Sequence, residues 1–166
     1  MKKELKKRIL SSLVLIPVSF FFIIKGSFFF NFFLIICLLA TLYEWHMMSN
    51  KKKYHLLGIL FLTLSFSTAY FLREDGLTIF LFIIIICIST DIGGYISGRL
   101  FKGPKLTKIS PNKTYSGVIG GYLFSIISTN IFLNYHYLLE LEKIEFNIIK
   151  FILVMLISSS SQIGDI

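Results

Sequence analysis

Apolar residues fall into six long runs, separated by short polar segments. The runs cover residues 9–24, 28–45, 54–72, 77–95, 117–139 and 147–163. At about 1.5 Å per residue, helices of these lengths reach roughly 24 to 35 Å, which is comparable to the approximately 30 Å hydrocarbon core of a bilayer. Only helices and closed barrels span lipid, and these runs are too long for barrel strands. The sequence therefore predicts an all-α, polytopic membrane bundle of about six transmembrane helices, forming a single domain over 1–166.

The first run is the shortest of the six, so a re-entrant or interfacial segment remains open for it. Lys25 follows this run, and its long side chain can reach the membrane interface while flanking residues extend the helix. We therefore favour a tight helical hairpin over 9–45.

Composition excludes a soluble fold. Hydrophobic residues make up 55% of the chain and the mean hydropathy is +0.76, which leaves too little polar surface to cover a soluble domain. The net charge of +8 does not indicate nucleic acid, because the basic residues cluster at the ends of apolar runs. Cys37 and Cys87 lie inside apolar runs without metal-ligand spacing, so we interpret them as buried small residues.

The basic residues predict the orientation of the chain in its membrane. Short loops on the cytoplasmic side collect Lys and Arg. With the N-terminus inside, that side receives thirteen of the 17 basic residues: Lys2, Lys3, Lys6, Lys7, Arg8, Lys51, Lys52, Lys53, Arg99, Lys102, Lys105, Lys108 and Lys113. We therefore expect a protein of the cell (inner) membrane with its N-terminus and a basic loop over 96–116 in the cytoplasm.

Asp91 is the most informative residue, because it lies inside the fourth apolar run. A carboxylate at mid-membrane depth costs roughly 2.5 to 3.5 kcal/mol on insertion scales, and such residues usually mark a working site. The alternative is an interfacial acid paired with a loop lysine.

Two glycine pairs flank the loop, Gly94 with Gly98 and Gly117 with Gly121, and their four-residue spacing predicts close helix packing.

The loop after this run offers positive charge. Individual lysines beside a membrane ordinarily contact lipid headgroups. Lys113 differs, because Pro111 fixes a turn around it just before a predicted helix start at Gly117. Backbone amides at a helix N-terminus together with a lysine can bind phosphate. No Walker loop is present in the sequence.

Two stretches carry a family resemblance: STDIGGYISGRLF and GPKLTKISPNKTYSGVIGG. With Glu44-Trp45 and the run from Ser161 to Asp165, they resemble the CDP-diacylglycerol synthase (phosphatidate cytidylyltransferase) family. The resemblance implies that CTP transfers a cytidylyl group to phosphatidate, a membrane lipid, with Mg²⁺ or another divalent cation as cofactor. It implies metal binding and catalysis by Asp91 and Asp165, a further catalytic role for Lys113, and substrate binding by Lys105, Ser110, Asn112, Lys113 and Thr114.

Family members continue beyond the Gly-Asp pair with a Pro-Gly-His-Gly-Gly turn and an Asp-Arg-x-Asp motif, which this sequence lacks. We therefore expect a C-terminally truncated form, inactive alone, whose site a separate C-terminal segment completes. A homodimer is also left open. Two alternatives remain: a CTP-dependent polyprenol or dolichol-type lipid kinase, and a non-catalytic membrane remnant or subunit.

Overall fold

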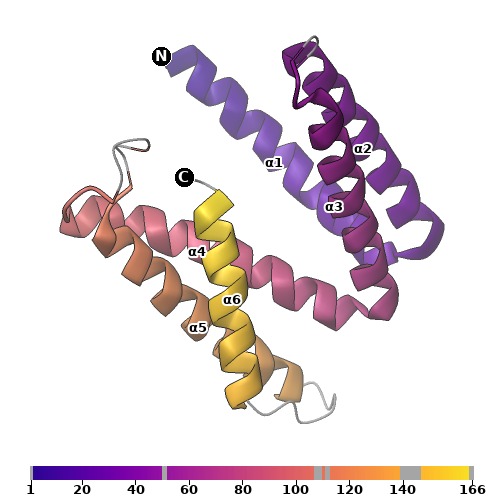
Figure 1. The fold of residues 1–166 in the computed structure, drawn as a ribbon. Coiled ribbons are helices and arrows are strands. Elements are labelled where there is room, and N and C mark those ends of the chain that lie inside the picture. Colours follow the sequence, from indigo (N-terminus) through magenta and orange to yellow (C-terminus); the bar gives the residue numbers. More distant parts are fainter. Residues whose placement is uncertain (1, 50–51, 107–109, 111–112, 139–146, 165–166) are drawn as a thin grey trace. The chain divides into compact units, whose positions relative to one another are not determined.

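The computed structural model describes the chain except for residues 1, 50–51, 107–109, 111–112, 139–146 and 165–166 (Figure 1). The described part is helical apart from its turns and loops and one isolated β-bridge. Its helices are α1 (Lys2–Lys25), α2 (Ser27–Ser49), α3 (His55–Asp75), α4 (Leu77–Phe101), α5 (Tyr115–Leu138) and α6 (Ile148–Gly164). The prediction of an all-α membrane bundle is confirmed.

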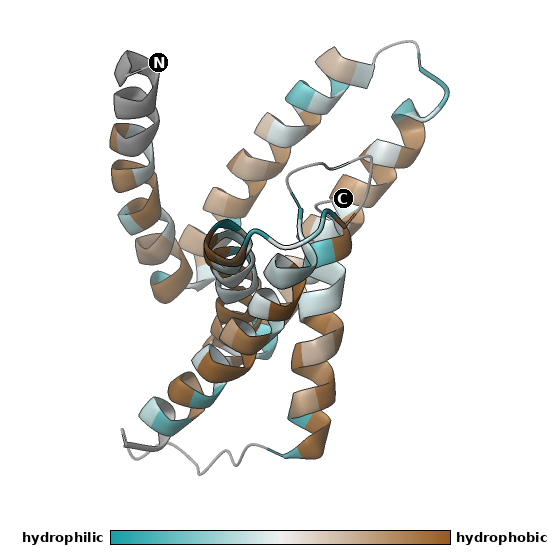
Figure 2. Ribbon diagram, turned by 90° about the vertical axis from the view of Figure 1, so that its left-hand side faces the viewer, coloured by the Kyte–Doolittle hydropathy of each residue, from teal (hydrophilic) through white to brown (hydrophobic). Residues whose placement is uncertain are grey.

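The helices have the length and apolar character of a multi-pass membrane protein. Within the described residues, four segments are long and apolar enough to cross a membrane: α2, α3, α4 and Tyr115–Tyr135 of α5. Two shorter apolar helices, Leu10–Lys25 and Ile148–Gly164, accompany them. In Figure 2, apolar residues run along most of each helix and hydrophilic residues concentrate near helix ends and connecting segments.

Helix α4 continues beyond the predicted end of the fourth run. We expected that run to end at Tyr95, but the helix reaches Phe101 and the following loop occupies 102–114. Glycines inside a helix normally weaken it, yet here they lie against another helix. At Gly94, an added Cβ would be 3.5 Å from the carbonyl oxygen of Gly117. This packing keeps the glycine-rich segment helical.

The chain divides into two compact units, Met1–Phe80 and Leu81–Ile166. In the first unit, the guanidinium of Arg73 donates a hydrogen bond from Nε to the carbonyl oxygen of Ile23 (3.0 Å), linking α3 to the end of α1. The Trp45 indole donates to the carbonyl oxygen of His55 (3.0 Å). Gly58 lies directly against the Trp45 ring, so α2 and α3 form a closely packed helical hairpin.

In the second unit, glycines of α4 and α5 lie close to each other. An added Cβ at Gly117 would be 2.9 Å from the carbonyl oxygen of Gly94, and one at Gly121 would be 3.1 Å from that of Thr90. Gly98 also faces Gly117, with 3.7 Å between its ideal Cβ position and the Gly117 Cα. The predicted glycine face is therefore confirmed. It brings the two backbones close together at the end that carries the loop.

Candidate functional site

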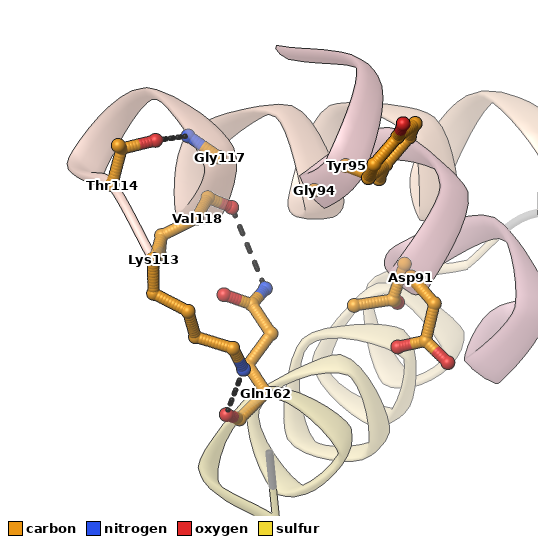
Figure 3. Close-up of a pocket in the computed structure, with 9 residues that line it drawn as sticks. Asp91, Gly94, Tyr95, Lys113, Thr114, Gly117, Val118 and Gln162 are labelled. Atoms are coloured by element: carbon orange, nitrogen blue, oxygen red, sulfur yellow. Dashed lines mark hydrogen bonds between the residues drawn. The ribbon is translucent and has the colours of Figure 1, made fainter. Parts of the chain in front are cut away.

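A cavity of about 190 Å³ lies in the second unit where α4, α5 and α6 meet the loop. Figure 3 shows its lining, with Asp91 on one side and Lys113 and Gln162 on the other. The lining residues are Thr90, Asp91, Gly94, Tyr95, Lys113, Thr114, Gly117, Val118 and Gln162. Polar and charged groups from four segments of the chain therefore converge on one hollow.

The two ends of the loop pair with each other and thereby fix the backbone at Lys113. Lys105 and Thr114 form an isolated antiparallel bridge. The Leu106 amide donates to the carbonyl oxygen of Lys113 (2.8 Å), and the Tyr115 amide donates to that of Pro104 (3.1 Å). Because these bonds flank Lys113, its backbone is held beside the start of α5.

The Lys113 ammonium contacts the end of another helix. Its Nζ donates a hydrogen bond to the carbonyl oxygen of Gln162 (3.0 Å), in the last turn of α6 (Figure 3). Carbonyl groups in the last turn of a helix lack intrahelical partners and carry the negative end of the helix dipole. A lysine is favoured there, so the loop and α6 stabilise each other at the cavity.

Thr114 is the N-cap of α5. Its hydroxyl oxygen accepts a hydrogen bond from the Gly117 amide (3.1 Å) and lies 3.0 Å from the Ser116 hydroxyl. A threonine oxygen at this position satisfies one of the unpaired amides at the start of a helix. Thr114 therefore lines the cavity while its hydroxyl also holds the beginning of α5.

Asp91 is exposed at the other side of the cavity. The Ser161 hydroxyl donates to its Oδ1 (3.2 Å), so among the described residues this carboxylate receives a hydrogen bond from α6. Consecutive residues of α6, Ser161 and Gln162, thus contact the acidic and the basic group of the cavity respectively.

Of the residues predicted for the site, Asp91, Lys113 and Thr114 line the cavity. Lys105 and Ser110 belong to the paired loop but are not among the lining residues. Asn112 and Asp165 lie outside the described residues.

Sequence reasoning did not assign Gln162 to the site. A signal was present, because an unbroken polar run, Ser158 to Gln162, ends an otherwise apolar helix. Such a run at the end of a membrane helix indicates polar partners on neighbouring helices.

Asp91 is the carboxylate among the residues that line the cavity. In the described part of the chain, no group of three His, Cys, Asp or Glu residues could hold a metal ion. Mg²⁺, however, is commonly bound by one or two carboxylates together with substrate phosphates and water. Asp91 could supply one carboxylate ligand to a cation of that kind.

Comparison with known proteins identifies similar chains. Residues 6–74 and 56–166 match the model of the cytidylyltransferase family. The chain is 31% identical to a phosphatidate cytidylyltransferase of Rickettsia bellii, over 99% of this chain and 74% of that protein. It is 34% identical to one of Rickettsia felis, over 74% of this chain and 56% of the relative. No solved structure matches.

A relative from another genus gives a similar result. The phosphatidate cytidylyltransferase of Staphylococcus saprophyticus is 33% identical over 67% of this chain and 41% of its own length. The chain thus spans part of each of these relatives, just over half of the one from R. felis. The matched residues include the α4–loop–α5 segment and α6.

Proposed function

This chain belongs to the cytidylyltransferase family, and on that premise we propose that it carries out cytidylyl transfer from CTP to phosphatidate. The products would be CDP-diacylglycerol and pyrophosphate. The relatives are named phosphatidate cytidylyltransferases, which supports this choice of substrates. The observation that carries the proposal is the convergence of Asp91 and Lys113 on one cavity, within the part of the chain that the family model matches.

In the proposed reaction, a phosphate oxygen of phosphatidate attacks the α-phosphorus of CTP. A new P–O bond forms there as the bond to the β-phosphate bridging oxygen breaks, and pyrophosphate leaves with that oxygen. Such a displacement needs positioning and charge neutralisation more than a covalent nucleophile. Lys113 would bind a phosphate of the nucleotide, since a lysine ammonium acts as a point charge with several N–H donors.

Asp91 would hold the divalent cation, with Asp165 as the second proposed ligand. A bound Mg²⁺ would supply positive charge that neutralises the triphosphate. The Ser161 hydroxyl donates a hydrogen bond to Asp91 Oδ1, which would restrict the orientation of this carboxylate.

The size of the cavity bears on what enters it. Sites for whole drug-sized ligands usually measure about 300–1,000 Å³, whereas this cavity measures about 190 Å³. We infer that it takes the charged phosphate part of the nucleotide. Lys105, Ser110 and Asn112 of the loop are proposed to contact the ligand outside the cavity.

The chain is a multi-pass membrane protein, and we propose that it lies in the cell (inner) membrane with the loop over 102–114 in the cytoplasm, where CTP is present. The distribution of basic residues supports that orientation. The homodimer and a separate C-terminal segment that completes the site stay predictions.

Two labels on CTP test the reaction class. The purified chain, alone and fused to the C-terminal segment of a family member, is incubated with phosphatidate, Mg²⁺ and CTP labelled at either the α- or the γ-phosphate. Cytidylyl transfer places the α-label in a lipid product and the γ-label in pyrophosphate. With a polyprenol as acceptor, γ-label in the lipid would instead identify a lipid kinase. Lipid without either label in both preparations would contradict the proposal.

A further inference from the structure

We propose that Gln162 is a positioning residue, which holds the Lys113 ammonium at the cavity by tying the last turn of α6 to α5. The inference rests on the proposed function only for the identity of the ligand, CTP. The structural part concerns the contacts of one residue with three elements and can be tested without any ligand.

Gln162 contacts the loop, α5 and its own helix at once. Its backbone carbonyl oxygen accepts the hydrogen bond from Lys113 Nζ (3.0 Å). Its side-chain Nε2 lies 3.4 Å from the carbonyl oxygen of Val118 on α5 and 3.4 Å from the hydroxyl oxygen of Ser158 on α6. The backbone carbonyl of Gln162 therefore binds the Lys113 ammonium, and the side-chain amide of Gln162 fixes the position of that backbone (Figure 3).

The neighbours of the amide are themselves firmly placed. The Ser158 and Thr90 hydroxyls lie 2.9 Å apart, and these residues are 0% and 1% exposed. Gly121 leaves room for the amide, since a Cβ at that position would lie 3.0 Å from Gln162 Nε2. The amide thus reaches α5 because a glycine permits it, and it bonds to a serine that is anchored to α4.

The end of a helix needs such support. Its last carbonyl groups have no intrahelical partner, and terminal turns fray unless they are tied down. Without the side-chain amide, the last turn of α6 would move and the carbonyl that accepts the Lys113 bond would move with it. Ser161, in the same turn, contacts Asp91. One turn of α6 therefore sets the separation of the two charged groups.

The first experiment measures Lys113 directly. Purified protein in detergent is treated with a water-soluble N-hydroxysuccinimide ester, and the acylation rate of Lys113 is read by mass spectrometry. We expect Gln162→Met to raise this rate about fivefold, the effect of losing roughly one hydrogen bond. The control is Ser160→Ala, an exposed position on the same turn, which should leave the rate unchanged. Ser158→Ala removes one partner of the amide and should also raise the rate. Equal rates in all four proteins would overturn the proposal.

The second experiment tests coupling through the ligand. CTP affinity is measured for the wild type, Gln162→Met, Lys113→Ala and the double variant. We expect each single change to weaken binding, Gln162→Met about fivefold, and the double variant to bind no more weakly than Lys113→Ala. Such non-additivity indicates that one residue acts through the other. Fully additive losses would overturn the positioning role. If the wild type binds no CTP, either alone or fused to the C-terminal segment of a family member, while the acylation rates change as expected, the proposed function fails and the positioning role stands.

Discussion

Replacing Gly93 with alanine should separate α4 from α5, whereas the same change at Gly94 should not. A Cβ at Gly93 would lie 2.6 Å from the carbonyl oxygen of Gly120 and 2.5 Å from the Phe124 Cβ. Ordinary contacts begin at 3.4 Å, so the first distance is 3.4 − 2.6 = 0.8 Å too short. A backbone carbonyl cannot rotate away, so the two helices must move apart.

At Gly94, the nearest atom to an added Cβ is the Gly117 carbonyl oxygen, 3.5 Å away. Both variants gain the same helix propensity, about 1 kcal/mol for alanine over glycine. The difference between them therefore isolates the clash, which should cost about 1–3 kcal/mol as overpacking does elsewhere. A difference of about 2 kcal/mol corresponds to roughly 4–8 °C in Tm for a chain of this size.

Thermal unfolding in detergent micelles, followed by circular dichroism at a helix wavelength, measures both variants against the wild type. We expect Gly94→Ala to melt at or above the wild-type Tm and Gly93→Ala to melt clearly below Gly94→Ala. Equal Tm values for the two variants would refute the reasoning, because they would mean that the α4–α5 distance is not set by these glycines.

Two further predictions concern α5 and the membrane orientation. Thr114→Ala removes the N-cap hydroxyl and should lower the free energy of unfolding by about 1 kcal/mol, or roughly 2–4 °C in Tm, while Thr114→Ser should retain it; equal losses in the two variants would argue against the cap. In a background without Cys37 and Cys87, a cysteine at Ser116 should react with an impermeant thiol reagent only from the cytoplasmic face, and one at Asn147 only from the outer face. Reversed labelling would contradict the proposed orientation.

The helices were predictable because apolar length alone is a strong signal in a membrane chain. Their ends were less so. The fourth run was expected to end at Tyr95, yet α4 continues through Gly98 to Phe101, and its glycines pack against α5. Helix propensity describes an isolated helix, whereas packing against the neighbouring helix determines where α4 ends.

The cavity was predictable in part. The position of Asp91 in an apolar run and that of Lys113 in a turn before a helix indicated chemistry, and the two residues line the same hollow. The contacts that α6 makes with α4 and the loop could not be predicted from the sequence. Ser161 and Asp91 are 70 positions apart, and Gln162 and Lys113 are 49 apart. Such pairs depend on the depth and rotation of α6 against α4 and α5, which hydropathy does not specify.

The serine run of α6 has a consequence for how the protein is made. Ser158 meets Thr90 of α4, Ser159 lies 2.8 Å from the Tyr122 hydroxyl of α5, and Ser161 meets Asp91. Each partner precedes α6 in the chain, so the ribosome has delivered it before α6 emerges. Insertion of this polar end into lipid alone is unfavourable, because polar groups in hydrocarbon need hydrogen-bond partners. The order of synthesis thus means that α4 and α5 are already present as the surface against which α6 packs.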